Sequence, residues 1–376
     1  MFQVTNFFIG AYLAWRLLAK WSLALNSKVV LSVLVIMLIE HHWLVSKIFG
    51  TSIPSPELPR SVLIALGFCY GVLLIGAVLI AIRDLAGLAL LLSTKIIGRR
   101  VLDSLRLTSA ILAVSVLASA LSVYEAIRVP RVTTLEVVLP HLPVELDGYK
   151  MALLTDLHLS RLLQQSWAQE VVTKTNSLNA NLVVISGDLV DGTLEDRAQD
   201  VEPLSALQAP DGVFAVSGNH EYYADYLSWM ARFRELGISF LENSHVVIRP
   251  DKGGFVLAGV PDQVSTNFSQ TPPDITKALM GKPEGLPVVL LDHRPGAMRA
   301  NAMAGADLQL SGHTHGGHIR GVDLVVKAFN NGFVSGHYQV GESTLYVSNG
   351  AGLWPGLPLR LGRPSEITLI TLRSLG

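Results

Sequence analysis

The hydrophobic residues of this chain are concentrated before residue 128, where they form long runs with few polar interruptions. Residues 61–82 contain no charged side chain, and about 20 apolar residues are enough to cross a bilayer as a helix. Residues 107–123 form a second uncharged run, whereas the runs at 2–20 and 29–43 are flanked or interrupted by polar residues. The pattern predicts four membrane-spanning helices. Residues 85–97 are too short to span and predict an interfacial helix.

The cations that border these runs predict how the helices are oriented. The positive-inside rule places in the cytoplasm the loop between the last two predicted spans, which carries Arg83, Lys95, Arg99, Arg100 and Arg106. The fourth span then leads outward, so that everything after residue 128 is predicted on the outer side. Arg16, Lys20 and Lys28 agree with this orientation, and the first two can reach a headgroup layer. Arg128 and Arg131 oppose it.

Two details of this region limit its interpretation. No Lys or Arg precedes the first apolar run and no small-residue cleavage site follows it, so a signal peptide is not predicted. Glu40, His41 and His42 interrupt the second run. They could be intramembrane groups for ions or protons, or they could mark the outer end of the second span, in water. We favour the second interpretation.

After a connector at residues 128–147, the pattern of residues 148–376 changes to short apolar runs that each end in a polar cluster. The clusters follow residues 151–154, 182–185, 213–216, 287–291 and 307–310. Runs of this length predict buried strands of an α/β fold, with helices expected at 165–178 and 222–236. Because sites of such folds gather beyond the ends of strands, the five polar clusters are expected to converge.

Composition narrows the class of protein. Half of the 376 residues are hydrophobic and 16% are charged, against roughly 25% in soluble domains, and the mean hydropathy is +0.42. The net charge of −1 gives no reason to expect nucleic acid as a partner. Cys69 is the one cysteine, which excludes an intrachain disulfide and a cysteine-rich metal site.

The polar clusters together contain the donor atoms of a metal centre. Their candidate ligands are two carboxylates, four imidazoles and one amide: Asp156, His158, Asp188, Asn219, His293, His313 and His315. A mixed set of this size suits two five- or six-coordinate ions that share a carboxylate, and it favours manganese, iron or zinc over calcium and magnesium. Two divalent ions less two aspartates and a hydroxide leave a positive centre that would attract a phosphate ester.

A simpler interpretation is that these are scattered turn residues, because Gly-Asp and Gly-Asn are common turn dipeptides. Asp156 and His158 alone could equally be an ordinary hydrogen-bonded pair. Five clusters behind five strand-like runs, together completing one ligand set, are at odds with coincidence.

In their order along the chain these motifs resemble the calcineurin-like metallophosphoesterase family. The matching residues are Asp156-x-His158, Gly187-Asp188-x-x-Asp191, Gly218-Asn219-His220-Glu221, His293 and Gly312-His313-x-His315. The resemblance covers roughly 145–376, and the apolar region is similar to that of bacterial members with an N-terminal transmembrane anchor. It implies a four-layered α/β sandwich of two mixed sheets flanked by helices, preceded by an all-α transmembrane region.

The resemblance also implies a role for each residue. One ion would be held by Asp156, His158, Asp188 and His315, and the other by Asp188, Asn219, His293 and His313. His220 would face the substrate and protonate the leaving alcohol. Asp191 or Glu221 would orient the His220 ring.

Several residues depart from the family pattern or invite a further role. Ser160 stands where relatives often have glycine, and His318 where they often have glutamine; neither change removes a ligand. Ser160 could alter the turn after the first metal loop. His318 could contact substrate, although an outer or solvent-exposed position is favoured. Trp229 and Phe233 are expected to pack in the core or against membrane, and Trp354 could cover the site.

The sequence therefore predicts a multi-pass inner-membrane phosphoesterase, of phosphodiesterase or pyrophosphatase type, whose catalytic domain is periplasmic and uses a metal hydroxide. Membrane lipids are expected partners, and the substrate could be a phospholipid or lipid-linked diphosphate. Hydrolysis of UDP-2,3-diacylglucosamine is an alternative that conflicts with this orientation. A non-catalytic receptor or scaffold is another, disfavoured because no ligand is missing. A transporter is disfavoured because the two clearest spans are uncharged.

Overall fold

The computed structural model describes residues 2–19, 21–49, 55–249, 251 and 253–375. The chain forms two compact units. One comprises Met1–Glu125 with Gly356–Leu359, and the other comprises Ala126–Pro355 with Arg360–Gly376. The segment 128–147, predicted as a connector, is part of the second unit and contains one of its strands.

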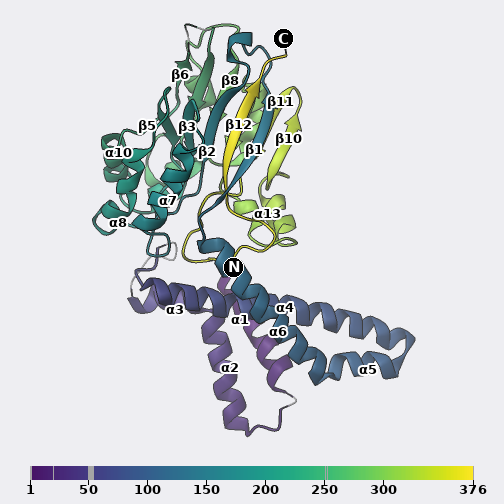
Figure 1. The fold of residues 1–376 in the computed structure, drawn as a ribbon. Coiled ribbons are helices and arrows are strands. Elements are labelled where there is room, and N and C mark those ends of the chain that lie inside the picture. Colours follow the sequence, from purple (N-terminus) through teal and green to yellow (C-terminus); the bar gives the residue numbers. More distant parts are fainter. Residues whose placement is uncertain (1, 20, 50–54, 250, 252, 376) are drawn as a thin grey trace. The chain divides into compact units, whose positions relative to one another are not determined.

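The first unit is helical (Figure 1): α1 (Phe2–Leu18), α2 (Leu25–Ile39), α3 (His41–Phe49), α4 (Arg60–Ser93), α5 (Lys95–Asp103) and α6 (Leu105–Ile127). Within the described residues, α4 and α6 are long and apolar enough to cross a membrane. Helices α2 and α3 meet that test only together, as a pair bent by 77°. The 17-residue α1 is not among the candidates. The structure thus supports two spans, or three with the bent pair, where four were predicted.

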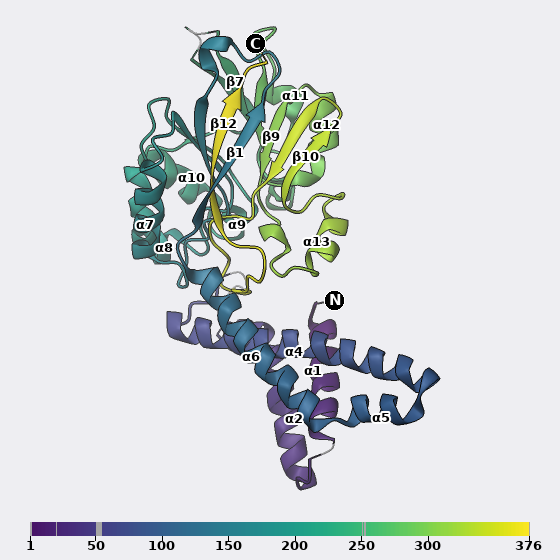
Figure 2. The ribbon, with the colours of Figure 1, turned by 45° about the vertical axis from the view of Figure 1, so that its right-hand side comes forward.

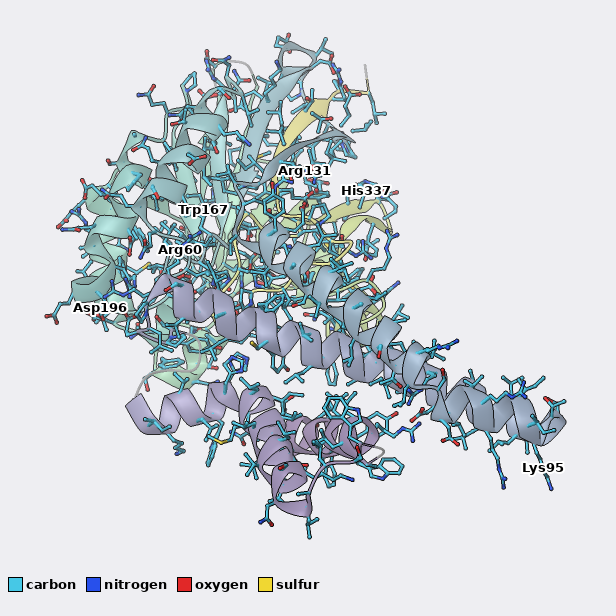
Figure 3. All side chains as sticks on the ribbon, turned by 60° about the horizontal axis from the view of Figure 1, so that its bottom comes forward. Arg60, Lys95, Arg131, Trp167, Asp196 and His337 are labelled. Atoms are coloured by element: carbon cyan, nitrogen blue, oxygen red, sulfur yellow. The ribbon has the colours of Figure 1, made fainter. Side chains whose placement is uncertain are left out.

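The prediction of a separate interfacial helix at 85–97 is wrong. Helix α4 continues to Ser93, because its Leu- and Ala-rich end has high helix propensity and contains no proline. Helix α5 then begins at Lys95 (Figure 3) and packs back against α4. The two helices meet at glycines: a Cβ added to Gly98 would lie 2.6 Å from the Leu91 backbone nitrogen.

Two polar groups of this unit differ from expectation. Arg16 was predicted to reach a headgroup layer, but its Nε lies 2.6 Å from Asp84 Oδ2. His41 and His42 follow the end of α2 but are buried rather than in water, with ring centroids 5.6 and 5.3 Å from that of Tyr70. Lys20, the other predicted flanking cation, lies outside the described residues.

The second unit contains two six-stranded mixed sheets (Figures 1 and 2). The first sheet has the order β1 (Arg131–Val138), β12 (Glu366–Arg373), β2 (Tyr149–Leu154), β3 (Leu182–Ser186), β4 (Val213–Val216), β5 (Ser239–Phe240). The second has the order β10 (Gly336–Val340), β11 (Ser343–Val347), β9 (Leu308–Ser311), β8 (Val288–Leu291), β7 (Phe255–Gly259), β6 (Ser244–Ile248).

One buried apolar cluster joins the two sheets. It contains Met151 and Val184 from the first sheet and Val289 and Leu308 from the second. The two sheets therefore pack face to face, and the core of the second unit lies between them.

Helices cover the outer faces of the sheets. Helices α7 (Gln165–Asn176), α8 (Leu194–Val201) and α10 (Tyr226–Glu235) lie beside the first sheet, and α11 (Ile275–Ala278), α12 (Met298–Met303) and α13 (Asp323–Phe329) belong with the second (Figures 1 and 2). Shorter helical pieces among the described residues include α9 (His220–Tyr223), η1 (Val144–Leu146), η2 (Glu202–Ala206), η4 (Gln263–Phe268), η5 (Pro295–Ala297) and η6 (His315–Gly317). This is the predicted sandwich of two mixed sheets flanked by helices.

Parallel pairing within each sheet positions the site. Strands β2, β3 and β4 run parallel in the first sheet, and β7, β8 and β9 run parallel in the second. Their carboxyl ends therefore meet at one edge of each sheet, where the polar clusters follow.

Candidate metal centre

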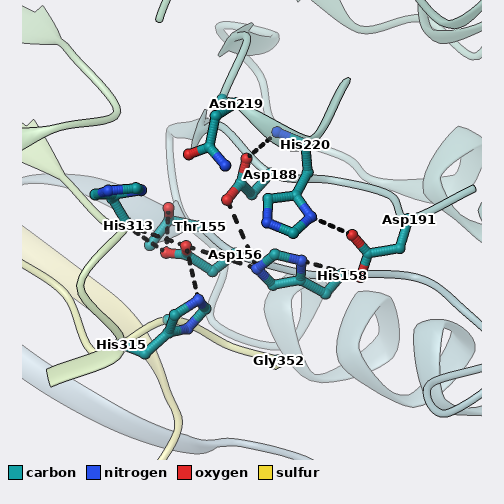
Figure 4. A network of polar contacts seen from close by, with 12 residues as sticks. Thr155, Asp156, His158, Asp188, Asp191, Asn219, His220, His313, His315 and Gly352 are labelled. Atoms are coloured by element: carbon teal, nitrogen blue, oxygen red, sulfur yellow. Dashed lines mark hydrogen bonds and ion pairs between the residues drawn. The ribbon is translucent and has the colours of Figure 1, made fainter. Parts of the chain in front are cut away.

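The loops that follow β2, β3, β4, β8 and β9 bring the predicted site residues together (Figure 4). In the part of the chain that the structure describes, three groups of side chains each bring their ligand atoms within 4.8 Å of one another. Two consist of predicted ligands, Asp156 with His158 and His315, and Asp188 with His293 and His313; the third is His158 with Asp191 and His220. Asp188 lies between them, with its Oδ2 3.6 Å from His158 Nε2 and 3.1 Å from His293 Nε2.

The donor atoms fit a metal centre, because several of them are buried without another partner. Among the described residues, His158 Nε2, His293 Nε2 and Asn219 Oδ1 have no hydrogen-bond partner, and the two ring nitrogens face carboxylates that are themselves predicted ligands. The opposite ring nitrogens are occupied: His158 Nδ1 pairs with Asp191 Oδ2 at 3.1 Å, and His293 Nδ1 donates to the Ser186 carbonyl at 2.7 Å. Such contacts fix a ring so that its other nitrogen faces a metal.

The backbone at five of the predicted ligands has a conformation that residues other than glycine rarely adopt. Asp156, His158, Asp188, His313 and His315 all have positive φ, between 47° and 68°. A non-glycine residue in this region costs on the order of 1–3 kcal/mol and tends to occur at functional sites. The loops are therefore locally strained where they aim these side chains at one point.

Two glycines allow the loops to approach. A Cβ at Gly218 would lie 2.1 Å from Asp188 Oδ1, and a Cβ at Gly312 would lie 2.1 Å from Thr155 Oγ1 and 2.2 Å from Asp156 Oδ2. Neither position can hold a larger residue without moving a predicted ligand.

Electrostatics keep three of the predicted ligands in states that can bind a metal. Burial, reinforced by the neighbouring His293, holds the pKa of His313 well below its usual range, and burial with the neighbouring His158 does the same for the pKa of His315. Burial alone would raise the pKa of Asp188, but His293 and His220 hold it well below its usual range. Neutral imidazoles and an ionised carboxylate are the forms that coordinate cations. His293 differs: burial would lower its pKa, but the Asp188 carboxylate raises it to about 10, so this ring has to lose a proton to bind a cation.

His220 is the predicted acid, and the structure places its ring beside Asp191. Its Nδ1 pairs with Asp191 Oδ1, and its backbone nitrogen donates to Asp188 Oδ1 at 2.9 Å. Burial would lower the pKa of His220, but the carboxylates of Asp188 and Asp191 raise it to about 9. A protonated imidazole at neutral pH can donate a proton to a leaving group.

Of the two acids predicted to orient this ring, Asp191 makes the contact. Glu221 instead accepts hydrogen bonds from backbone nitrogens of the loops after β3 and β4, including Leu189 at 2.6 Å and Gly218 at 2.7 Å. Glu221 therefore ties two ligand-bearing loops together.

The structure also places the other residues for which the sequence suggested a role. Trp229 and Phe233 are buried and stack with centroids 5.3 Å apart, as packing residues. Ser160 is buried, and its Oγ accepts from the Leu162 nitrogen in the turn after the first loop. The Trp354 ring lies 6.5 Å from that of His220, and the His318 ring lies 5.1 Å from that of His315.

Arg294 is the main site residue that sequence reasoning missed. Its Nε donates to Asp262 Oδ2 at 2.7 Å, and its Nη1 donates to His313 Nε2 at 3.1 Å. Its position directly after His293 was the available signal. The guanidinium group of Arg294 thus places a positive charge beside the predicted ligands.

Comparisons with known proteins agree with the geometry. Residues 149–317 match the model of the calcineurin-like phosphoesterase family. A Helicobacter pylori protein named uncharacterized metallophosphoesterase is 37% identical over 66% of this chain and 65% of its own length. A zebrafish (Danio rerio) protein named transmembrane protein with metallophosphoesterase domain is 35% identical over 72% of this chain and 63% of its own.

A Bacillus subtilis protein, also named uncharacterized metallophosphoesterase, is 30% identical over 62% of this chain and 82% of its own length. A solved calcineurin-like phosphoesterase of Bacillus subtilis aligns with a TM-score of 0.35 and 16% identity, over 55% of this chain and 81% of that one. The chain spans 65% and 63% of the Helicobacter and zebrafish relatives.

Proposed function

Because the chain belongs to the calcineurin-like metallophosphoesterase family, we propose that it is a metal-dependent phosphoric ester hydrolase with two metal ions. The observation that carries this proposal is the convergence of seven predicted ligand residues from five loops, with buried donor atoms that the described residues leave available to a cation. No ligand of the set is replaced, which disfavours a receptor or scaffold that only binds.

The residues divide between two ions. Asp156, His158 and His315 would hold one, Asn219, His293 and His313 the other, and Asp188 would contact both. Bound divalent ions would polarise the phosphoryl group and lower the pKa of a water. The imidazole-rich set favours manganese, iron or zinc.

Two residues of the chain supply the proton: His220 donates it, and Asp191 holds the His220 ring in place. Asp191 holds the His220 ring through Nδ1, which leaves Nε2 as the proton donor to the departing alcohol. Asp191 also holds His158 through its other oxygen, so that one carboxylate fixes both a predicted ligand and the predicted acid.

The apolar helices associate the protein with a membrane. We place it as a multi-pass protein of the inner membrane with the second unit on the periplasmic side, because Arg83, Lys95, Arg99, Arg100 and Arg106 lie between the apolar parts of α4 and α6. A lipid or lipid-linked phosphate ester is the substrate that this location favours. A cytoplasmic nucleotide sugar such as UDP-2,3-diacylglucosamine is the alternative if the orientation is reversed.

The test measures hydrolysis of a chromogenic phosphodiester by detergent-purified protein with manganese, with a chromogenic monoester assayed in parallel. We expect cleavage that is abolished in Asp188→Asn and His220→Ala and retained in His337→Ala, a change of an exposed histidine outside the site. Bound transition metal is measured in the same samples. Normal activity in both site variants would overturn the proposal, and a folded, metal-free, inactive protein would favour a binding role.

A further inference from the structure

An exposed apolar surface adjoins the predicted metal loop. We define the α13 patch as Val322, Leu324, Val325 and Phe329, whose relative exposures are 41%, 71%, 57% and 86%. Large apolar side chains exposed together on one short helix are typical of a surface that contacts another apolar phase.

The patch is held firmly from its inner side. Asp323, the acidic residue of α13, is buried, accepts from the Gly321 nitrogen at 2.6 Å and pairs with Arg363. A Cβ at Gly317 would lie 2.4 Å from the Asp323 Cα, so the helix packs closely on the loop that carries His315. The exposed side chains are therefore presented by an anchored helix.

The exposed charges on the segment that carries the patch have one sign. Between residues 318 and 332 the only acidic residue is Asp323, which is buried and paired, whereas Arg320 and Lys327 are exposed. An apolar face bordered by exposed cations matches the surface of a bilayer that contains anionic lipid.

The end of the patch leads toward the predicted metal centre. Phe329 lines a cavity of about 410 Å³ together with Ile275, Val260 and Arg294. Arg294 in turn donates to His313 at the metal centre. The cavity thus brings the apolar Phe329 and the guanidinium of Arg294 to one space. The carboxylate of Asp292 also lines this space, and Arg294 is paired with Asp262.

We propose that the α13 patch contacts an anionic lipid surface and that the substrate is an amphiphilic phosphate ester taken from that surface. Its phosphate would lie at Arg294 and its apolar part toward Phe329. This inference rests on the proposed function, and it adds the surface from which the substrate is taken and the residues that would receive its phosphate and its apolar part.

The first test measures whether the patch lies in lipid or in water, and it does not depend on activity. Leu324→Cys, in a Cys69→Ser background, is labelled with an environment-sensitive fluorophore in full-length protein reconstituted with phosphatidylglycerol and phosphatidylcholine. We expect quenching by lipid-bound nitroxides and protection from aqueous iodide. A label at Leu227→Cys, an exposed position on α10, should show the reverse. Iodide access at 324 equal to that at 227, or protection from both quenchers, would overturn the proposal.

The second test compares two substrates. Leu324→Glu with Val325→Glu should lower hydrolysis of a long-chain chromogenic phosphodiester in vesicles by about tenfold or more, because burial of each apolar side chain is worth that factor. The same double variant should hydrolyse a short water-soluble diester at an unchanged rate. The control variant Leu227→Glu should hydrolyse both substrates at an unchanged rate. Equal activity on the vesicle substrate would overturn this inference alone, whereas no cleavage of the soluble diester by the unmodified protein would overturn the proposed function.

Discussion

At the scale of single residues, Asp191 has a central position that the sequence indicated only in part. The motif Gly187-Asp188-x-x-Asp191 pointed to it, and Glu221 was an equal candidate. Only the structure separates them, because the choice depends on where two loops place their side chains. The positive φ of five predicted ligands was likewise invisible in the sequence, since no residue type there requires it.

Asp191→Asn is expected to weaken both functions of this carboxylate. The amide keeps the shape but loses the charge that holds the rings of His158 and His220. We expect kcat to fall by about 10²–10⁴-fold and metal affinity by about 10–100-fold. Steady-state kinetics and metal titration measure the two effects. Glu195→Gln, at an exposed site, is the control, and full kcat in Asp191→Asn would contradict the role.

Gly312→Ala tests the close approach of the loops. Its Cβ would meet Thr155 Oγ1 and Asp156 Oδ2 at 2.1 and 2.2 Å, so we expect a loss of about 1–3 kcal/mol in stability together with lower metal content. Thermal unfolding and metal analysis read these effects. Gly296→Ala is the matched control, because its nearest atom lies at 3.5 Å. Equal behaviour of the two variants would show that the loop tolerates the added carbon.

At the scale of elements, short apolar runs identified the strands that precede the predicted ligands, because burial on both faces leaves a continuous hydrophobic signal. The same reasoning failed at β1. Its residues lie between Pro130 and Pro140 and were therefore assigned to a connector, although β1 pairs with β12 from Arg131 to Val138. That pairing joins residues more than 200 positions apart, which no local pattern reveals.

Two neighbouring residues test whether β1 is structural. Val137 is buried in the core between the sheets, whereas Val138 is 49% exposed. Val137→Asp should cost about 3 kcal/mol or more in unfolding free energy, since it buries an unpaired charge. Val138→Asp should change it by about 0.5 kcal/mol or less. Denaturant unfolding of the purified protein compares them. Similar losses in both would argue against the pairing of β1.

At the scale of the whole molecule, hydropathy located the apolar region but overestimated its spans, because α1 is short and the second run bends after Ile39. The proposed orientation depends less on the number of spans. We argue it from the cations between the apolar parts of α4 and α6, and α6 leads into the second unit with three residues between Ile127 and Arg131.

Cysteine labelling in spheroplasts tests this orientation. With Cys69→Ser as background, a membrane-impermeant maleimide should react with His337→Cys in the second unit, which faces outward in our proposal. It should reach Lys95→Cys at the start of α5 only after lysis, because the positive-inside rule keeps that cationic segment in the cytoplasm. Both positions are exposed, so access to the reagent depends on the side of the membrane. The reverse pattern would place the metal centre inside the cell, where a nucleotide-linked substrate would become the stronger candidate.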